Sequence, residues 1–161
     1  MGLNLILYFF SFLEFAQPEF DTILCLSTTK WIHLNFGDDG LKRAFKRMFA
    51  QLRNNGMLII EPQALASYSK KAKKINQVTK DNFKNMKLMP NQFVDYLINE
   101  VGFTGGEVIA VPEHSALGFR RPIHVSWNIC RKAFFFLILL VYFHFFQCFL
   151  VKKNVVIITH S

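Results

Sequence analysis

The sequence predicts an α/β domain built around a parallel sheet, and three segments predict it. Two short apolar runs bounded by polar residues, Asp21–Leu26 and Met57–Ile60, are typical of strands buried in a parallel sheet. Between them, Leu41–Leu52 repeats apolar residues at helical spacing, which indicates an amphipathic helix. A strand, a helix and a strand joined by short links form a right-handed βαβ unit.

The ends of this helix have recognisable signals. Asp38-Asp39-Gly40 predicts its start, because acids stabilise the first turn, and Asn54-Asn55-Gly56 predicts its end. In open α/β sheets, ligands bind beyond the carboxyl ends of the strands. We therefore expect Cys25–Lys30 and Glu61–Tyr68 to line one crevice together.

The rest of the middle region supplies further elements. The Lys-rich stretch Ser69–Lys87 predicts helix and loop, and Pro90 can open a helix that Gly102 closes. Glu107–Val111 and Pro122–Trp127 have the composition of strands and are expected to pair as an antiparallel hairpin.

Both ends of the 161-residue chain are unusually apolar, and most of its 19 Phe residues gather there. Residues 1–16 lack the basic start of a secretory signal, and Ile6 stands where myristoylation needs Ser or Thr. They are a cleaved leader, a buried element, or sequence foreign to the domain, and we favour the last two. The predicted organisation is a leader at 1–16, a domain at 17–127 and a hydrophobic tail at 128–161.

The tail contains a candidate membrane segment. Residues 134–151 carry no formal charge, have basic residues on both sides and reach the length of a membrane-spanning helix. His144 and Gln147 count against that interpretation. Two alternatives stand: a membrane anchor, or apolar sequence that does not belong to the folded protein.

Charge and cysteine content narrow the function classes. The net charge is +8, and between Lys30 and Lys87 basic residues far outnumber acids. Such a surface attracts polyanions, RNA above all, although a solvated basic face is the plain alternative. Three scattered cysteines form no CxxC pattern, so the sequence predicts no metal site and no disulfide framework. A reduced, intracellular setting fits best.

One long stretch carries a family resemblance. The segment FDTILCLSTTKWIHLNFGDDGLKRAFKRMFAQLRNNGMLIIEPQ, Phe20–Gln63, resembles the bicoid-interacting-protein type of RNA methyltransferase, the family of the 7SK RNA methylphosphate capping enzyme. The likeness extends over about Gln17–Trp127. It implies the C-terminal part of a Rossmann-like class I methyltransferase sheet, with DTILCL as the fourth strand and MLIIE as the fifth.

The chain also departs from the family pattern. Nothing before Asp21 resembles the glycine-rich cofactor loop or the acid for the ribose hydroxyls that the family carries, so we expect the N-terminal strands to be missing from this sequence. Asn54-Asn55-Gly56 stands where Pro-Gly-Gly is usual, and Ala64-Leu65 where a Trp is usual. We expect an unpaired sheet edge at the fourth strand, which would favour aggregation, and a hydrophobic helix at the C-terminus.

The resemblance implies methyl transfer from S-adenosylmethionine to an oxygen of the 5′-terminal phosphate of a small RNA. A phosphate monoester is already charged near neutral pH, so the protein must align the reactants and supply cations rather than a strong base. The candidate residues are catalytic Lys30 and His33, cofactor-binding Cys25, Leu26 and Ser27, and substrate-binding Trp31, Glu61, Gln63, Tyr68, Arg120 and Arg121.

Each candidate has a structural alternative. Lys30 could be a surface lysine of a helix, His33 a hydrogen-bonded structural histidine, and Trp31 a core residue. The expected partner is the 5′ end of a small RNA, the expected location nucleus or cytoplasm, or a membrane if the tail is an anchor, and the complete domain is expected to be a monomer. The alternative function is a catalytically inactive RNA-binding or membrane-attached module.

Overall fold

The computed structural model describes residues 17–110, 121–128 and 155–159. They form a five-stranded mixed sheet in the order β3-β4-β2-β1-β5. Strands β1, β2 and β5 run parallel, whereas β4 pairs antiparallel with both β2 and β3. This arrangement confirms the predicted α/β class and the predicted hairpin. The strands are β1 (Phe20–Leu26), β2 (Leu52–Glu61), β3 (Gly105–Ala110), β4 (Ile123–Trp127) and β5 (Val155–Thr159).

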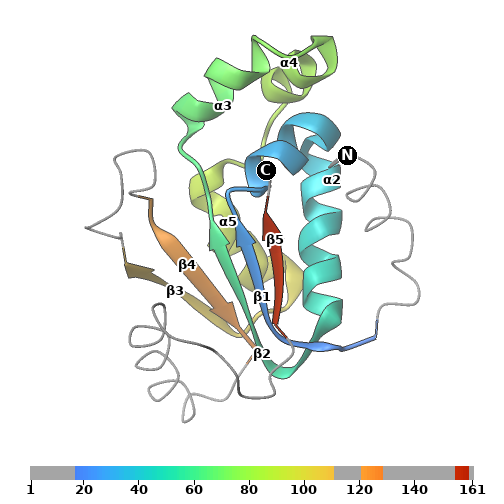
Figure 1. Ribbon diagram of the computed structural model, residues 1–161, viewed down its shortest axis with the longest axis vertical. Coiled ribbons are helices and arrows are strands. Elements are labelled where there is room, and N and C mark those ends of the chain that lie inside the picture. The colour runs from blue at the N-terminus through green and yellow to red at the C-terminus, as the bar shows by residue number, and fades with distance from the viewer. Residues whose placement is uncertain (1–16, 111–120, 129–154, 160–161) are drawn as a thin grey trace.

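The helices lie in two places. In Figure 1, α2 and α5 lie against the sheet, whereas α3 and α4 extend beyond the carboxyl ends of β1 and β2. The Pro90 helix of the sequence prediction is present, as a 3₁₀ turn followed by one α turn and a π turn, and Gly102 ends it in the left-handed conformation with φ 115°. The helical elements are α2 (Thr29–Gln51), α3 (Leu65–Ala72), α4 (Gln77–Lys84), η2 (Pro90–Gln92), α5 (Phe93–Tyr96) and η3 (Leu97–Val101).

The main core lies between the sheet and these helices. Alternate residues of the strands face it, among them Ile23 of β1 and Leu58 of β2. They pack against Phe45 and Phe93, whose rings make an edge-to-face contact with centroids 5.4 Å apart. All four side chains are fully buried. This core fixes the positions of β1 and β2 and therefore of the residues that follow them.

The start of the helix differs from the sequence prediction. Helix α2 begins at Thr29, well before Asp38, and bends at Gly37, which has φ 68° and ψ −170°. The bend rotates the apolar face, so the helical spacing before Gly37 does not continue the spacing after it. Asp38 consequently lies inside a bent helix, and its carboxylate contacts His33 and the backbone near Lys87 rather than the start of the helix. Lys30, Trp31 and His33 belong to the first turns of α2.

The end of the helix also lies earlier than predicted. Helix α2 stops at Gln51, and β2 begins at Leu52. The pairing with β1 slips between Phe20–Leu52 and Thr22–Met57, so extra residues of β2 form an irregularity there. Within it, Asn55 has φ 66°. The Asn-Asn-Gly signal therefore marks a bulge in the strand rather than the end of the helix.

The expectation of an unpaired edge at β1 was wrong. Strand β5 pairs in parallel with β1 from Thr22–Val155 to Leu26–Thr159. Its residues alternate: Val156 and Ile158 pack against the main core, whereas Val155 and Ile157 are exposed. The strand lies in the segment that the sequence predicts as the hydrophobic tail. Its residues Val155–Thr159 are all β-branched, and such residues favour strands.

Three sequence predictions fall outside the described residues: the leader at 1–16, the apolar run at 134–151 and Arg120. Within the described ranges, no helix combines the length and the apolar character that crossing a membrane requires.

Candidate active site

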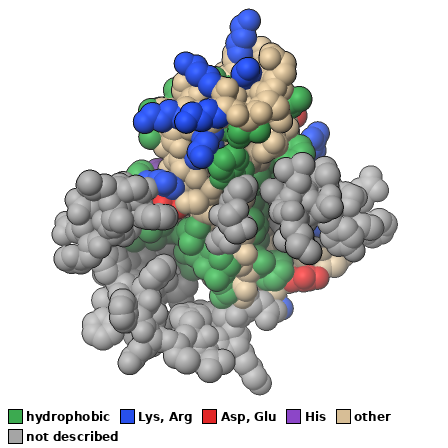
Figure 2. Space-filling view, turned by 45° about the horizontal axis from the view of Figure 1, so that its top comes forward, with side chains coloured by type: hydrophobic (Ala, Val, Ile, Leu, Met, Phe, Trp, Pro, Cys, Tyr) green, Lys and Arg blue, Asp and Glu red, His purple; other side chains and the backbone are tan. Residues whose placement is uncertain are grey.

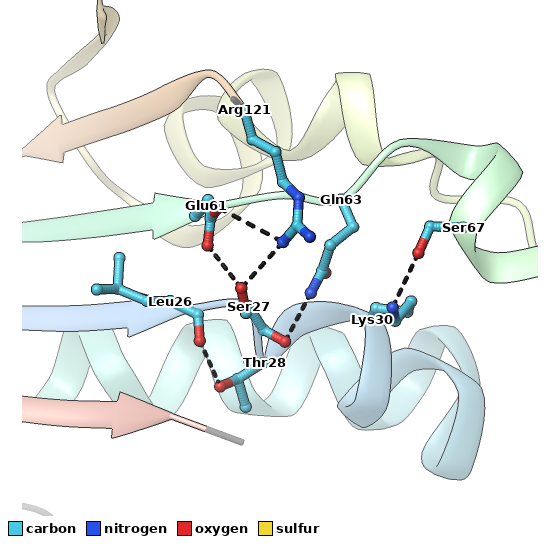
Figure 3. Close-up of polar contacts among 8 residues, drawn as sticks. All are labelled: Leu26, Ser27, Thr28, Lys30, Glu61, Gln63, Ser67 and Arg121. Atoms are coloured by element: carbon cyan, nitrogen blue, oxygen red, sulfur yellow. Dashed lines mark hydrogen bonds and ion pairs between the residues drawn. The ribbon is translucent and has the colours of Figure 1, made fainter. Parts of the chain in front are cut away.

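Polar side chains meet beyond the carboxyl ends of β1 and β2, where the sequence predicts a shared crevice. We call this group the edge cluster, and Figure 3 shows its contacts. The residues come from the β1–α2 turn, the first turn of α2, the end of β2, the link between β2 and α3, helix α3, and the residue two positions before β4. Its members are Ser27, Lys30, Glu61, Gln63, Ser67 and Arg121.

Ser27 occupies the centre of the edge cluster in a strained conformation. Its φ of 54° lies in the left-handed region that residues other than glycine rarely adopt. Surrounding contacts hold it there: its hydroxyl donates to Glu61 Oε2 at 2.7 Å, and its carbonyl oxygen accepts from Gln63 Nε2 at 2.6 Å. Strain maintained by several contacts is typical of functional sites.

Arg121 reaches the edge cluster from the other side of β2. Its Nη1 lies 3.0 Å from Ser27 Oγ and 3.4 Å from Glu61 Oε1. The arginine side chain is 26% exposed and the Glu61 side chain 12% exposed. The guanidinium is therefore fixed at the edge of the sheet while part of it remains accessible to a ligand.

Lys30 supplies a second cation. Its Nζ donates to Ser67 Oγ at 2.9 Å, and only 6% of the residue is exposed. Burial, reinforced by the positive charges of Arg121 and Lys71, lowers the pKa of the Lys30 ammonium. The nearby positive charges raise the cost of keeping Lys30 protonated, and an anion bound beside it would lower that cost.

An aromatic ring lies beside the cations. Lys30 Nζ lies 5.0 Å and Lys71 Nζ 5.8 Å from the centroid of the half-buried Trp31 ring. Cations at such distances are attracted to the face of an indole. The same ring is a surface on which a nucleobase can stack.

Three predicted site residues do not face the edge cluster. Cys25 is fully buried among core residues, and Tyr68 is fully buried in a smaller core cluster with Leu34, Ala72 and Met86. Burial strongly raises the pKa of the Tyr68 hydroxyl. His33 is also fully buried, and its ring meets Tyr68 edge-on at 5.8 Å. Leu26 is half-buried, and its carbonyl oxygen accepts from Thr28 Oγ1 at 2.9 Å.

The burial of Cys25 gives a first testable prediction. Burial raises the pKa of its thiol to about 12, so almost no thiolate exists at neutral pH. In a variant with Cys130→Ser and Cys148→Ser, a thiol reagent should leave the folded protein unmodified and react fully after denaturation. Mass spectrometry reads both states, and rapid modification of the folded protein would contradict the burial of this strand.

His33 belongs to a second polar group, centred on Asp38. His33 Nε2 lies 2.7 Å from Asp38 Oδ1, and Asp38 Oδ2 accepts from the backbone N–H groups of Lys87 and Leu88 at 2.9 and 3.0 Å. Burial lowers the pKa of His33 although Asp38 opposes that effect. Burial acts to raise the pKa of Asp38, but its hydrogen bonds outweigh burial and lower it. The group ties the bend in α2 to the segment before Pro90.

Sequence reasoning gave no individual role to three residues that matter here. Ser67, within the predicted crevice segment Glu61–Tyr68, accepts a hydrogen bond from Lys30, and Lys71 lies beside the Trp31 ring. Asp38 was interpreted as a helix-start acid. Among the described residues, no group of three His, Cys, Asp or Glu side chains could hold a metal ion.

The chain is therefore an α/β protein with a mixed sheet, and the carboxyl ends of its parallel strands β1 and β2 present two cations and an aromatic ring, at the edge where α/β proteins bind ligands. Comparison with known proteins identifies the family. The profile of Bicoid-interacting protein 3 (Bin3) matches residues 20–128, and the chain belongs to that family.

Two relatives cover about the same part of the chain. The U6 snRNA methylphosphate capping enzyme Amus of Drosophila melanogaster is 51% identical over 114 residues, which are 70% of this chain and 38% of that protein. The human 7SK snRNA methylphosphate capping enzyme is 44% identical over 113 residues, 70% of this chain and 16% of that protein. The chain thus spans well under half the length of these relatives.

A SAM-dependent methyltransferase from Thermotoga maritima superimposes with a TM-score of 0.44 at 18% identity, covering 70% of this chain and 58% of the other.

Proposed function

We propose that this chain forms the RNA-binding, C-terminal part of an S-adenosylmethionine-dependent methyltransferase that methylates an oxygen of the 5′-terminal phosphate of a small RNA. The observation that carries the proposal is the edge cluster, in which Lys30 and Arg121 lie near enough for their charges to interact and Lys30 lies beside Trp31. The names of the relatives, methylphosphate capping enzymes and an RNA 5′-monophosphate methyltransferase, support the same substrate class.

The edge cluster has the chemistry that a terminal phosphate requires. A phosphate monoester carries between one and two negative charges near neutral pH, and its oxygens are already nucleophilic. Lys30 would neutralise one oxygen, and Arg121 would bind another once it turns from Glu61. Trp31 would stack on the first base. These contacts align an oxygen for attack without needing a general base.

His33 and Tyr68 act indirectly in this proposal. Both are fully buried, and neither side chain reaches the edge cluster. Their buried rings pack against each other beneath the first turns of α2, and this packing would hold Lys30 and Trp31 in place.

Residues just beyond the ends of β1 and β2 fit part of the cofactor. The buried Gln63 Oε1 has no donor among the described residues, although Gln63 Nε2 holds the Ser27 carbonyl oxygen. An unsatisfied buried acceptor fits an ammonium or amino group of a ligand. Gln63, with the backbone at Leu26 and Ser27, would hold the methionine part, and the cofactor would supply an electrophilic methyl group on its sulfonium.

A basic surface continues from the edge cluster. Figure 2 shows Lys and Arg side chains gathered over the α3–α4 end of the molecule. The exposed lysines of this surface, which we call the lysine arm, are Lys70, Lys71, Lys73, Lys74, Lys80 and Lys84. Asp81 is the only acid between Pro62 and Val94. Such a surface would bind the RNA backbone downstream of the 5′ end without reading its sequence.

The lysine arm predicts salt-dependent binding. Replacing Lys73 and Lys74 by alanine should reduce the slope of log affinity against log salt by about 0.7 per lost phosphate contact for single-stranded RNA. Affinity should fall similarly for 5′-phosphorylated and 5′-hydroxyl RNA. Fluorescence anisotropy over a salt series measures the slope, and an unchanged slope would place the RNA backbone elsewhere.

The proposed function is tested by titrating the chain with S-adenosylmethionine and with RNA, and by assaying radioactive methyl transfer to 5′-phosphorylated RNA. Methyl transfer would support the proposal in full. RNA binding with preference for a 5′ phosphate but without cofactor binding would favour the alternative of a catalytically inactive RNA-binding module. Absence of any preference for a 5′ phosphate would contradict the role of the edge cluster.

A further inference from the structure

Strand β5 lies beyond residues 20–128, the part that matches the family, yet it fills the edge of β1. We propose that β5 is a positioning element of the edge cluster: it orders the β1–α2 turn and thereby places Ser27 and Lys30. Its effect on RNA binding rests on the proposed function, whereas its effect on the turn does not.

A hydrogen bond links β5 directly to the turn. Thr28 Oγ1 lies 3.1 Å from the carbonyl oxygen of Ile158 and 2.9 Å from that of Leu26. The hydroxyl has one proton, so the two carbonyl groups share it. Thr28 is only 1% exposed with β5 in place, so its hydroxyl is satisfied by these two carbonyl groups rather than by bulk water.

Thr28 also begins the helix that carries Lys30. Its carbonyl oxygen accepts from the N–H groups of Trp31 and Ile32, at 2.9 and 3.2 Å. The Thr28 side chain makes no capping hydrogen bond to the first turn of α2, so only its backbone carbonyl group stabilises that turn. The position of Thr28 therefore determines where the first turn of α2 begins, and β5 holds Thr28 from the side opposite Glu61 and Gln63.

Side-chain packing keeps β5 in register. Val156 and Ile158 pack against the main core, whereas Ile157 points outward and is 61% exposed. A charge introduced at the partly buried Ile158 would lie against the apolar core and would disfavour docking of the strand, but the same charge at Ile157 would remain in water. The two positions therefore form a matched pair for experiment.

The first experiment compares Ile158→Asp with Ile157→Asp in the full chain by hydrogen exchange. Ile158→Asp should accelerate amide exchange at least tenfold in the Thr22–Leu26 segment and in Trp31 and Ile32, whereas Ile157→Asp should resemble the wild type. Equal exchange in the two variants would overturn the docking of β5. A 5′-phosphorylated 12-nucleotide RNA should bind Ile158→Asp about tenfold more weakly than Ile157→Asp.

A milder pair tests positioning without disturbing the core. Thr28→Val keeps the shape but removes the hydroxyl, and Thr28→Ser keeps the hydroxyl. Thr28→Val should increase exchange at Trp31 and Ile32 about fivefold, and Thr28→Ser should restore the wild-type rate. Identical rates in all three proteins would overturn the positioning role. Faster exchange together with unchanged RNA affinity would contradict the proposed function and leave the structural role of β5 intact.

Discussion

Replacement of Lys30 by methionine should weaken binding of a 5′-phosphorylated RNA by roughly 10- to 150-fold, the range expected for losing a hydrogen bond to a charged group. Methionine keeps most of the aliphatic length, so packing against Trp31 should survive. Burial and the positive charges of Arg121 and Lys71 lower the pKa of Lys30, and a bound phosphate would offset that unfavourable charge. Fluorescence anisotropy measures the affinity.

Two controls make this result specific. The same variant should bind 5′-hydroxyl RNA nearly as well as the wild type does, because only the terminal phosphate meets Lys30. Replacing the exposed Lys84 by methionine removes an equal charge far along the lysine arm and should weaken both RNAs alike. Equal losses for the two RNAs in the Lys30 variant would show that Lys30 contributes only general charge.

Replacement of Asp38 by alanine should destabilise the fold by about 3 kcal/mol, roughly 10 °C in melting temperature. The carboxylate accepts from two backbone N–H groups and contacts the fully buried His33. Removing it leaves the buried His33 ring and the Leu88 N–H without this partner, which costs more than the lost hydrogen bonds alone. Thermal unfolding followed by circular dichroism measures the loss.

The neighbouring residue supplies the control for Asp38. Asp39 carries the same charge on the same helix but is exposed, so Asp39→Ala should change stability by less than about 0.5 kcal/mol. Equal effects of the two substitutions would contradict the role of Asp38.

The two pKa shifts give this group a predicted pH dependence. The folded protein lowers the pKa of His33 below its ordinary 6.5 and that of Asp38 below its ordinary 3.8. The unfolded chain therefore binds more protons, first below about pH 6.5 and then below about pH 4. The free energy of unfolding should fall with acid in both pH ranges. The difference in that free energy between the wild type and Asp38→Ala should narrow only below about pH 4, where Asp38 becomes protonated.

The sheet and the meeting of its strand ends could be predicted because their signals are local. The runs Asp21–Leu26 and Met57–Ile60 are short, apolar and separated by one helical pattern, and that is sufficient to place Ser27 near Glu61. The family resemblance added the expected ligand class. Of the candidates it suggested, Ser27, Lys30, Glu61, Gln63 and Arg121 meet in the structure.

The remaining features depend on contacts distant in the sequence. The bend at Gly37 is stabilised by Asn82, whose Nδ2 donates to the Leu34 carbonyl oxygen at 2.9 Å. This contact joins residues distant in the sequence, so no local pattern predicts it. The burial of His33 depends on Asp38 and on the segment near Lys87. Strand β5 pairs with an edge more than a hundred residues away in the sequence, and nothing in its own short apolar sequence indicates that partner.

Photocrosslinking can locate the 5′ end of an RNA, which we propose to lie against Trp31 at the edge cluster. A 5′-phosphorylated RNA with 4-thiouridine as its first nucleotide would be irradiated with the full chain, and the modified peptides mapped by mass spectrometry. We predict crosslinks at or beside Trp31 and in the facing segment of α3 around Ser67, with competition by 5′-phosphorylated RNA. Crosslinks confined to α4, or spread evenly over the lysine arm, would contradict the placement of the RNA 5′ end at the edge cluster.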